Sequence, residues 1–178
     1  MTASDLGIFI VRLAVALTFA AHGAQKVLGW WGGPGFAAWT SGIARMGLRP
    51  APFWAAISSG VELVGGLLLA LGLFTPIASA LLVAQSTYIV LRTHLPRGFW
   101  NSRGGIEFPL QLLAGSLLVV ASGPGAIAID PAVGLDFSVS WRAGSLVVAL
   151  VGALVAMGIA RPRPQAQPPT PSPSSGLP

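Results

Sequence analysis

Residues 6–25, LGIFIVRLAVALTFAAHGAQ, form the stretch of sequence that decides the fold, because they are apolar over the length of a membrane-spanning helix. Such a helix needs about 20 mostly apolar residues. A secretory signal has a positively charged start and an uninterrupted apolar core. Here residues 1–5 contain no Lys or Arg, and Arg12 interrupts the apolar run. We therefore expect a transmembrane helix rather than a cleaved signal.

Four more stretches of this kind follow along the chain. They lie at residues 53–73, 76–93, 106–122 and 143–160. The 178-residue chain is 53% hydrophobic and 8% charged, whereas soluble domains carry about 25% charged residues. The bilayer is the solvent that fits this composition, and the five stretches leave no room for a separate soluble domain. The sequence predicts an all-α fold, a transmembrane helical bundle with a four-helix core and a fifth transmembrane helix.

The predicted organisation has three parts: a core at residues 1–131, the fifth helix at 132–160 and a tail at 161–178. The tail contains seven prolines and no periodicity, so we expect it to be disordered or polyproline-like. In the loop at residues 26–52, apolar side chains recur at helical spacing. They are Phe36, Trp39, Ile43 and Met46. A short helix at residues 36–46 in the headgroup region and an irregular loop both fit this segment.

Local signals refine the second and third spans. Gly60, Gly65 and Gly66 are small residues that allow helices in a membrane to approach closely. Thr75 is expected to cap the third helix, with Pro76 in its first position.

The basic residues predict how the chain is oriented. A net charge of +5 would suggest nucleic-acid binding in a soluble protein, but here Lys and Arg are few and lie at helix ends. They gather in the loops at 26–52 and 92–103 and in the tail, whereas the opposite side has only Arg142. Cytoplasmic loops carry the excess of Lys and Arg. We expect a multi-pass protein of the cell membrane, with its N-terminus outside and its C-terminus in the cytoplasm. Its partner is the lipid bilayer and not nucleic acid.

Two charged residues, Arg12 and Glu62, lie well inside the predicted spans. Each costs about 2.5–3.5 kcal/mol on insertion scales, so such residues need partners and often mark function. Their expected depths are close enough for the long Arg12 side chain to reach Glu62. We predict an Arg12–Glu62 ion pair, which either fixes helix register or takes part in function.

A second polar group gathers at the cytoplasmic end. His22 and Lys26 share one face of the first helix because they are four residues apart. With Glu62, Asn101 and Glu107 they outline a polar funnel that is a candidate ligand-binding site. Ordinary interfacial polarity is the alternative, with Lys26 extending to the headgroups. His94 is expected only to bind carbonyl groups at a helix end.

The order of several motifs resembles that of DoxX family membrane proteins. The motifs are RLAVALTFAAHGAQKVLGWWGG at 12–33, ELVGG at 62–66, HLPRGFWN at 94–101, GGIE at 104–107, and GPG at 123–125 followed by Asp130. The resemblance covers about residues 7–131. It implies a four-helix membrane core, from which the fifth span and the tail of this chain depart.

The resemblance also implies a redox setting. Some members of the family resemble, or are named for, a subunit of a thiosulfate:quinone oxidoreductase. In mycobacteria a member is associated with a superoxide dismutase and a thiosulfate sulfurtransferase. We therefore expect a component of a membrane redox complex linked to quinones or to sulfur compounds and oxidants, with soluble redox enzymes as partners at the cytoplasmic face.

The chain offers little chemistry of its own for such a role. It has no cysteine and only two histidines, and it has no phosphate-binding loop and no His-x-x-x-His pair. We predict no metal site, and a haem held by the two histidines is disfavoured. Catalytic residues and cofactor stay open, with a quinone as the cofactor that the setting allows. At most the chain is an oxidoreductase subunit without an electron carrier of its own. A membrane scaffold for soluble redox enzymes and a transporter of small molecules or protons are the alternatives.

Overall fold

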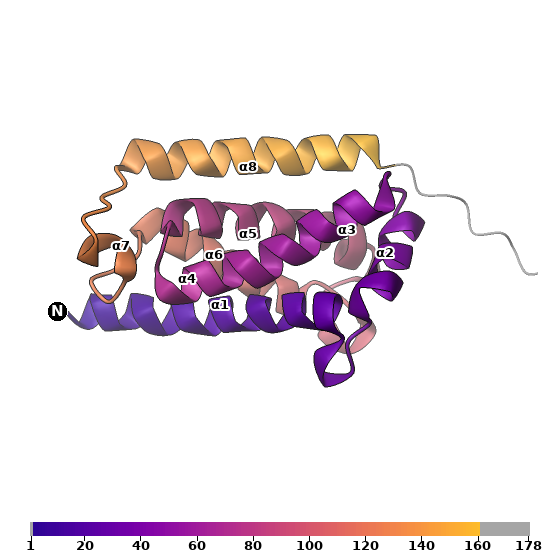
Figure 1. Ribbon diagram of the computed structural model, residues 1–178, viewed down its shortest axis with the longest axis horizontal. Coiled ribbons are helices and arrows are strands. Elements are labelled where there is room, and N and C mark those ends of the chain that lie inside the picture. The colour runs from indigo at the N-terminus through magenta and orange to yellow at the C-terminus, as the bar shows by residue number, and fades with distance from the viewer. Residues whose placement is uncertain (1, 161–178) are drawn as a thin grey trace, which may run out of the picture.

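The computed structural model describes residues 2–160 and is all-α over that range (Figure 1). Met1 and residues 161–178, which include the predicted proline-rich tail, lie outside the described residues. The α-helices are α1 (Ala3–Leu28), α2 (Gly35–Arg45), α3 (Ala51–Gly60), α4 (Gly66–Leu71), α5 (Thr75–Ile89), α6 (Glu107–Ser122), α7 (Ile129–Ala132) and α8 (Val139–Ile159). Residues 2–160 also contain two π-helical segments, η2 (Val61–Gly65) and η3 (Val90–His94), and three short 3₁₀ segments, η1 (Trp30–Gly32), η4 (Leu95–Arg97) and η5 (Asn101–Arg103).

Each of the five predicted spans is helical. Three helices are long and apolar enough to cross a membrane: α1, the continuous run from α3 through η2 to α4 (Ala51–Leu71), and α8. Helix α6 is apolar but shorter, and α5 continues through η3 to His94. This confirms an all-α membrane bundle, and the short helix predicted at residues 36–46 is α2. Membrane crossing by α5 and α6 stays a prediction.

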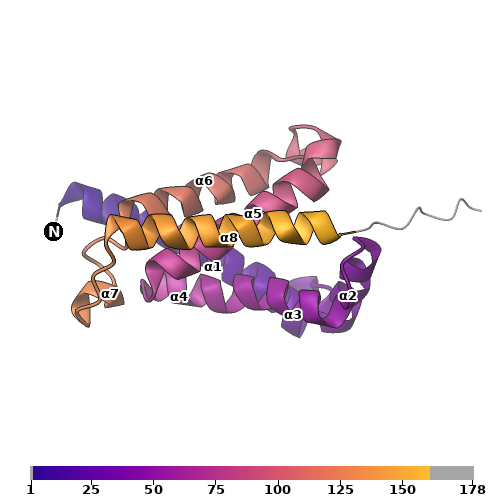
Figure 2. The same ribbon diagram turned by 90° about the horizontal axis from the view of Figure 1, so that it is seen from above.

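The helices form a bundle in which α1 and α8 lie on opposite faces (Figure 1). Helix α5 lies between these faces and packs on both α6 and α8. Seen from above, α3 and α4 lie to one side of α8, and α6 lies to the other (Figure 2). Helix α2 crosses the end of the bundle that is far from the N-terminus, and α7 lies at the N-terminal end.

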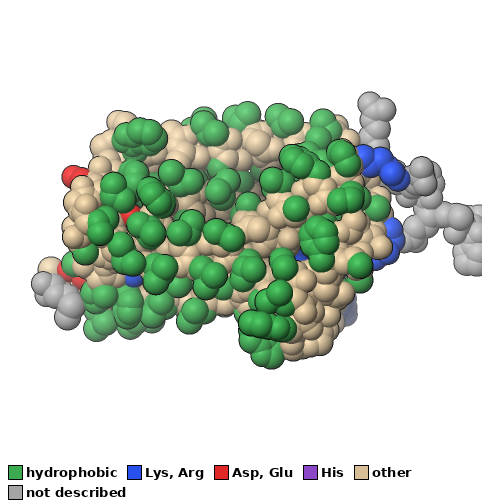
Figure 3. Space-filling view, in the orientation of Figure 1, with side chains coloured by type: hydrophobic (Ala, Val, Ile, Leu, Met, Phe, Trp, Pro, Cys, Tyr) green, Lys and Arg blue, Asp and Glu red, His purple; other side chains and the backbone are tan. Residues whose placement is uncertain are grey.

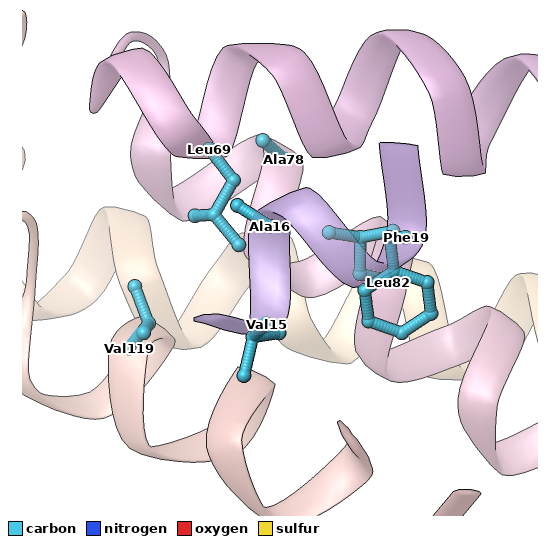
Figure 4. Close-up of a cluster of buried hydrophobic side chains, with 7 residues drawn as sticks. All are labelled: Val15, Ala16, Phe19, Leu69, Ala78, Leu82 and Val119. Atoms are coloured by element: carbon cyan, nitrogen blue, oxygen red, sulfur yellow. The ribbon is translucent and has the colours of Figure 1, made fainter. Parts of the chain in front are cut away.

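The core contains small and medium apolar side chains from four helices. One buried cluster consists of Val15, Ala16, Phe19, Leu69, Ala78, Leu82 and Val119, from α1, α4, α5 and α6 (Figure 4). Many larger apolar side chains are instead exposed, and only 11% of the most apolar part of α8 is buried. In a bilayer these exposed side chains face lipid, so the arrangement is that of a membrane protein rather than of a water-soluble bundle.

Helix α1 approaches the second span without intervening side chains. A Cβ atom on Gly66 would lie 2.6 Å from the backbone nitrogen of Ala20, and one on Gly23 would lie 2.3 Å from that of Leu63. Gly66 thus has the predicted close-packing role. Gly60 does not, because a Cβ there would meet nothing within 4 Å.

Charge is distributed unevenly between the two ends of the bundle. The visible Asp and Glu side chains lie at the end where α7 is found, and most visible Lys and Arg side chains lie at the α2 end (Figure 3). The sides between the two ends are largely apolar, as a bilayer requires.

Candidate functional site

Glu62 is the buried acid at the centre of the candidate site. It is only 2% exposed. Its Oε1 atom accepts hydrogen bonds from Lys26 Nζ at 2.5 Å and from Gln85 Nε2 at 2.9 Å. The other carboxylate oxygen, Oε2, is buried and has no hydrogen-bond partner among the described residues. The site therefore holds a neutralised acid with one oxygen still free to accept a hydrogen bond.

A π-helical turn presents Glu62 to its partners. The turn, Val61–Gly65, interrupts the long second span, and it is flanked and ended by glycines that weaken regular α-helix. A π-turn places one extra residue in the helix, and such turns often occur at functional sites. Close packing of Gly23 on Leu63 brings this turn against the end of α1, where Lys26 lies. The three bonded side chains thus come from α1, η2 and α5.

Helix α2 covers the site through Trp39. The Lys26 ammonium lies 4.3 Å from the centre of the Trp39 ring, within the range of a cation–π contact. The indole N–H of Trp39 donates to Ser58 Oγ at 2.9 Å, and Gln85 Nε2 donates to the Ser58 carbonyl at 2.9 Å. These bonds tie α2, α3 and α5 together around the ion pair. The Lys26 side chain is consequently only 13% exposed.

The predicted Arg12–Glu62 ion pair is wrong. The partner of Glu62 is Lys26, the one ion pair within residues 2–160. Along α1, Lys26 lies about 21 Å from Arg12 at 1.5 Å per residue. Close packing of Gly23 and Gly66 fixes Glu62 near the Lys26 end of α1. Arg12 and Glu62 therefore lie at different depths in the bundle. The prediction placed Glu62 too close to the N-terminal end of α1.

Arg12 instead belongs to a polar cluster at the opposite end of the bundle. Its guanidinium donates to the carbonyl oxygens of Pro124 at 2.7 Å and Ile127 at 2.5 Å. Asp130 supplies a nearby negative charge. Arg12 and Asp130 are 1% and 0% exposed. The loop that begins with Gly123-Pro124-Gly125 thus closes the bundle over Arg12.

Asp130 also caps α5, so the predicted cap by Thr75 is wrong. The two carboxylate oxygens accept from the backbone N–H groups of Phe74 at 2.7 Å and Thr75 at 2.9 Å. These are the groups that the first turn of a helix leaves without partners. Thr75 is the first helical residue, and Pro76 lies in the same turn. Asp130, which is 55 positions from Thr75 in the sequence, thus provides the cap that was expected from a side chain at the start of α5.

The structure only partly brings together the other predicted funnel residues. His22 is half-buried, and its ring lies 5.9 Å from that of Phe108 at the α1–α6 contact. Glu107 accepts from the backbone N–H of Asn101 at 3.0 Å, which orders the loop before α6. None of the hydrogen bonds described over residues 2–160 joins Asn101 or Glu107 to Lys26 or Glu62. As expected, His94 binds a carbonyl oxygen, that of Gly104 at 2.7 Å.

Two contact residues of the site were not predicted as such. Gln85 is a polar side chain inside an apolar span, which was a usable signal because such residues are costly in a membrane. Trp39 had a signal only for an interfacial helix. Among residues 2–160, no group of three or more His, Cys, Asp and Glu side chains could hold a metal ion.

The fold and this site define a class: a small multi-pass membrane protein with a buried Lys–Glu–Gln cluster at one end of its bundle. The model of the DoxX family matches residues 7–95. An uncharacterized membrane protein of Mycobacterium tuberculosis, Rv3486, is 30% identical over 134 residues, which is 69% of this chain and 78% of that protein. The chain belongs to the DoxX family.

A second relative carries a functional name. A Bacillus subtilis protein named "Putative oxidoreductase CatD" is 28% identical over 127 residues, covering 71% of this chain and 87% of that protein. No solved structure matches the chain.

Proposed function

We propose that the chain is the membrane component of a redox complex, and that its buried Lys26–Glu62–Gln85 cluster binds a small quinol-like ligand. The observation that carries this proposal is the free Oε2 atom of Glu62. A buried polar atom without a partner costs about 1–3 kcal/mol. A ligand that donates a hydrogen bond to this oxygen would recover that energy.

The donor and acceptor pattern selects among ligand classes. Lys26 already neutralises the charge of Glu62, and the unsatisfied atom is an acceptor. A phenolic hydroxyl can donate to it, whereas the carbonyl oxygens of an oxidised quinone and the oxygens of a sulfur oxyanion cannot. The residues thus fit the reduced, hydroxyl-bearing form of a quinone. When bound, such a molecule would supply a two-electron, two-proton carrier to the complex.

The chain's own residues would bind this ligand and accept the hydrogen bond from its hydroxyl group. Glu62 Oε2 would accept the hydroxyl hydrogen bond, and Lys26 would supply the counter-charge of the carboxylate through its contact with Oε1. Gln85 would hold the Glu62 carboxylate in position from α5. Trp39 would limit the access of water and headgroups to the ion pair from the α2 side. His22 is half-buried and lies on the same face of α1 as Lys26, so it would line the part of the site next to Lys26.

The name of the Bacillus subtilis relative as an oxidoreductase supports a redox role. The electron-transferring partners would be soluble enzymes docked at the α2 end of the bundle. We further propose that this end is cytoplasmic, that the N-terminus is outside, and that all five helical spans cross the membrane. The lopsided placement of basic side chains supports this orientation (Figure 3).

Purification from membranes in a mild detergent tests the proposal. Mass spectrometry should find a bound quinone or quinol, together with a soluble redox enzyme, on the wild-type protein. Glu62→Gln and His22→Ala should lose the bound ligand while inserting normally. His94→Ala should retain it, since His94 binds only a loop carbonyl.

Two results would reject this function. If the wild-type protein carries a soluble enzyme but no ligand, and all three variants keep that enzyme, the chain is a scaffold. If ligand retention is the same in all four proteins, the ligand binds elsewhere and the Glu62 cluster has only a structural role.

A further inference from the structure

A cavity lies at the end of the bundle opposite the Glu62 site. Its volume is about 470 Å³, and it opens between the start of α1, the end of α6 and the start of α8. Its lining includes three charged side chains, Asp5, Asp136 and Arg142. Cavities of roughly 300–1,000 Å³ are typical of sites for small molecules. This one is far from Glu62 and is not used in the function proposed above.

The three charges line the same cavity without pairing with one another. The ion pair between Lys26 and Glu62 is the one found within 4.0 Å over residues 2–160, so Arg142 contacts neither acid that closely. Opposite charges that share a cavity without meeting leave a gap that a ligand of matching charges can bridge.

Arg142 is held in place but is not saturated with hydrogen bonds. Its Nη1 atom donates to the carbonyl of Ala121 at 2.6 Å. Its Nε atom is buried without a partner among the described residues. An Arg guanidinium offers five N–H donors in a planar fork that suits the oxygens of phosphate. The guanidinium N–H groups of Arg142 that face the cavity would therefore bind a phosphate group placed there.

The two acids differ in how much of their carboxylate is free. Asp5 accepts from the backbone N–H groups of Thr2 at 2.7 Å and Ala126 at 3.2 Å, so it is fixed by the N-terminal cap of α1 and by the segment after α6. Asp136 is exposed, and no hydrogen bond joins its carboxylate to any residue of the described range. Asp136 is therefore the acid that would bind a cationic group, and Asp5 adds negative potential to the same cavity.

The mixed charges of the lining disfavour a simple ion. An anion at Arg142 would face two carboxylates, and a metal cation at the carboxylates would face a guanidinium. A zwitterion with a phosphate and a primary ammonium, joined by a short linker, satisfies both sides. We propose that this cavity binds a phosphoethanolamine group.

The surroundings of the cavity match the headgroup layer of a membrane. Phe137 lines it, and Phe137 packs edge-on against exposed Trp141 at a centroid distance of 6.5 Å. Aromatic side chains of this kind gather at the interface between bilayer and water. Trp141 also lines an apolar groove of about 570 Å³ between α5 and α8, which has room for part of an acyl chain. An aminophospholipid and a soluble phosphoethanolamine compound are the two sources of the ligand.

Native mass spectrometry of the delipidated full chain in detergent tests this site. The lipids are dioleoyl phosphatidylethanolamine, the corresponding phosphatidylcholine, whose quaternary ammonium has no N–H, and the corresponding phosphatidylglycerol, which has no cation. We expect the ethanolamine lipid to be retained about tenfold more than either, a ratio that corresponds to about 1.4 kcal/mol. Arg142→Gln and Asp136→Asn should each abolish this preference. Arg103→Gln, at the other end of the bundle, should leave it unchanged.

The source of the ligand and the failure of the proposal are both measurable. If millimolar glycerophosphoethanolamine displaces the lipid, the headgroup alone is sufficient for binding. If it does not displace the lipid, the acyl chains are also needed. Equal retention of the three lipids, or a preference for phosphatidylglycerol, would overturn the proposal. Because Asp136 is exposed in a loop, an unchanged preference in Asp136→Asn would overturn it even if Arg142→Gln fails to fold.

Discussion

Glu62 and Lys26 depend on each other inside the bundle. Removing one partner of a buried ion pair leaves an uncompensated charge, which is costly, whereas removing both leaves a neutral site. Lys26 retains some exposure and a cation–π contact with Trp39, so its isolated charge is better tolerated than that of Glu62. Loss of Lys26 should therefore lower the stability of the protein more than loss of Glu62, because Glu62 then has no cation nearby.

The first prediction concerns this pair. Lys26→Met should destabilise the protein by about 2–4 kcal/mol, and adding Glu62→Gln should recover at least half of that loss. The measurement is thermal unfolding in detergent over a double-mutant cycle. Replacing Arg12 instead of Lys26 serves as the control, since Arg12 does not contact Glu62 and should show no coupling with it. A double mutant whose loss equals the sum of the two single losses would contradict the pairing.

Asp130 is the second buried residue whose contacts should matter for stability, because it caps α5 and lies near Arg12. We predict that Asp130→Ala lowers the free energy of unfolding by about 2–4 kcal/mol, more than the loss of an ordinary helix cap. The matched control is Asp136→Ala, which removes an exposed acid from the same connection between α6 and α8 and should change stability by less than about 0.5 kcal/mol in lipid-free detergent. Equal effects of the two substitutions would show that the Asp130 contacts carry no particular weight.

At the scale of elements, contact between α1 and the second span sets the depth of the Glu62 site. Gly23 and Gly66 bring two backbones together, and the π-turn between α3 and α4 places Glu62 opposite Lys26. Alanine at either glycine would have to push the helices apart, because the atoms it meets belong to the backbone. The register of one helix pair therefore decides which charges can meet.

The third prediction tests that contact. Gly66→Ala should destabilise the bundle by about 1–3 kcal/mol through overpacking. Gly60→Ala, six residues earlier in the same span, should be neutral or slightly stabilising, because its Cβ has open space and alanine favours helix. Thermal unfolding of the two variants side by side gives the comparison. A stable Gly66→Ala protein would mean that α1 and α4 do not pack as closely as described.

At the scale of the whole molecule, composition and apolar periodicity were enough to predict the helical bundle. The five stretches could be inferred from local sequence. The same sequence allowed the short helix at 36–46 but equally an irregular loop, and it predicted close packing for Gly66 but also for Gly60, where a Cβ would meet nothing within 4 Å. The partners of the buried charges could not be inferred from local sequence. They depend on helix register and on a loop 55 positions from the helix that it caps, neither of which leaves a local signal. The π-turn escaped prediction for the same reason, since its residues also suit ordinary helix.

The fourth prediction concerns topology. The backbone N–H of Asp130 donates to the carbonyl of Gly72 at 2.8 Å, so the two loops that contain them lie at one end of the bundle. Reporter fusions after Gly72 and Gly134 should therefore report the same side, and we expect that side to be outside. A fusion after Gly98 should report the cytoplasm. Opposite signals at Gly72 and Gly134 would contradict the bundle itself, whereas a shared cytoplasmic signal would contradict only its orientation.

The most direct test of the central claim is an equilibrium titration of the purified protein with a short-chain quinol, its oxidised quinone and its dimethyl ether. The ether keeps the size and ring of the quinol but has no hydroxyl to donate to Glu62 Oε2. We predict that the wild-type protein binds the quinol at least about tenfold more tightly than the other two. Glu62→Gln should lose the preference for the quinol, because an amide nitrogen takes the place of the accepting oxygen. Equal binding of the three compounds by the wild-type protein would contradict the account.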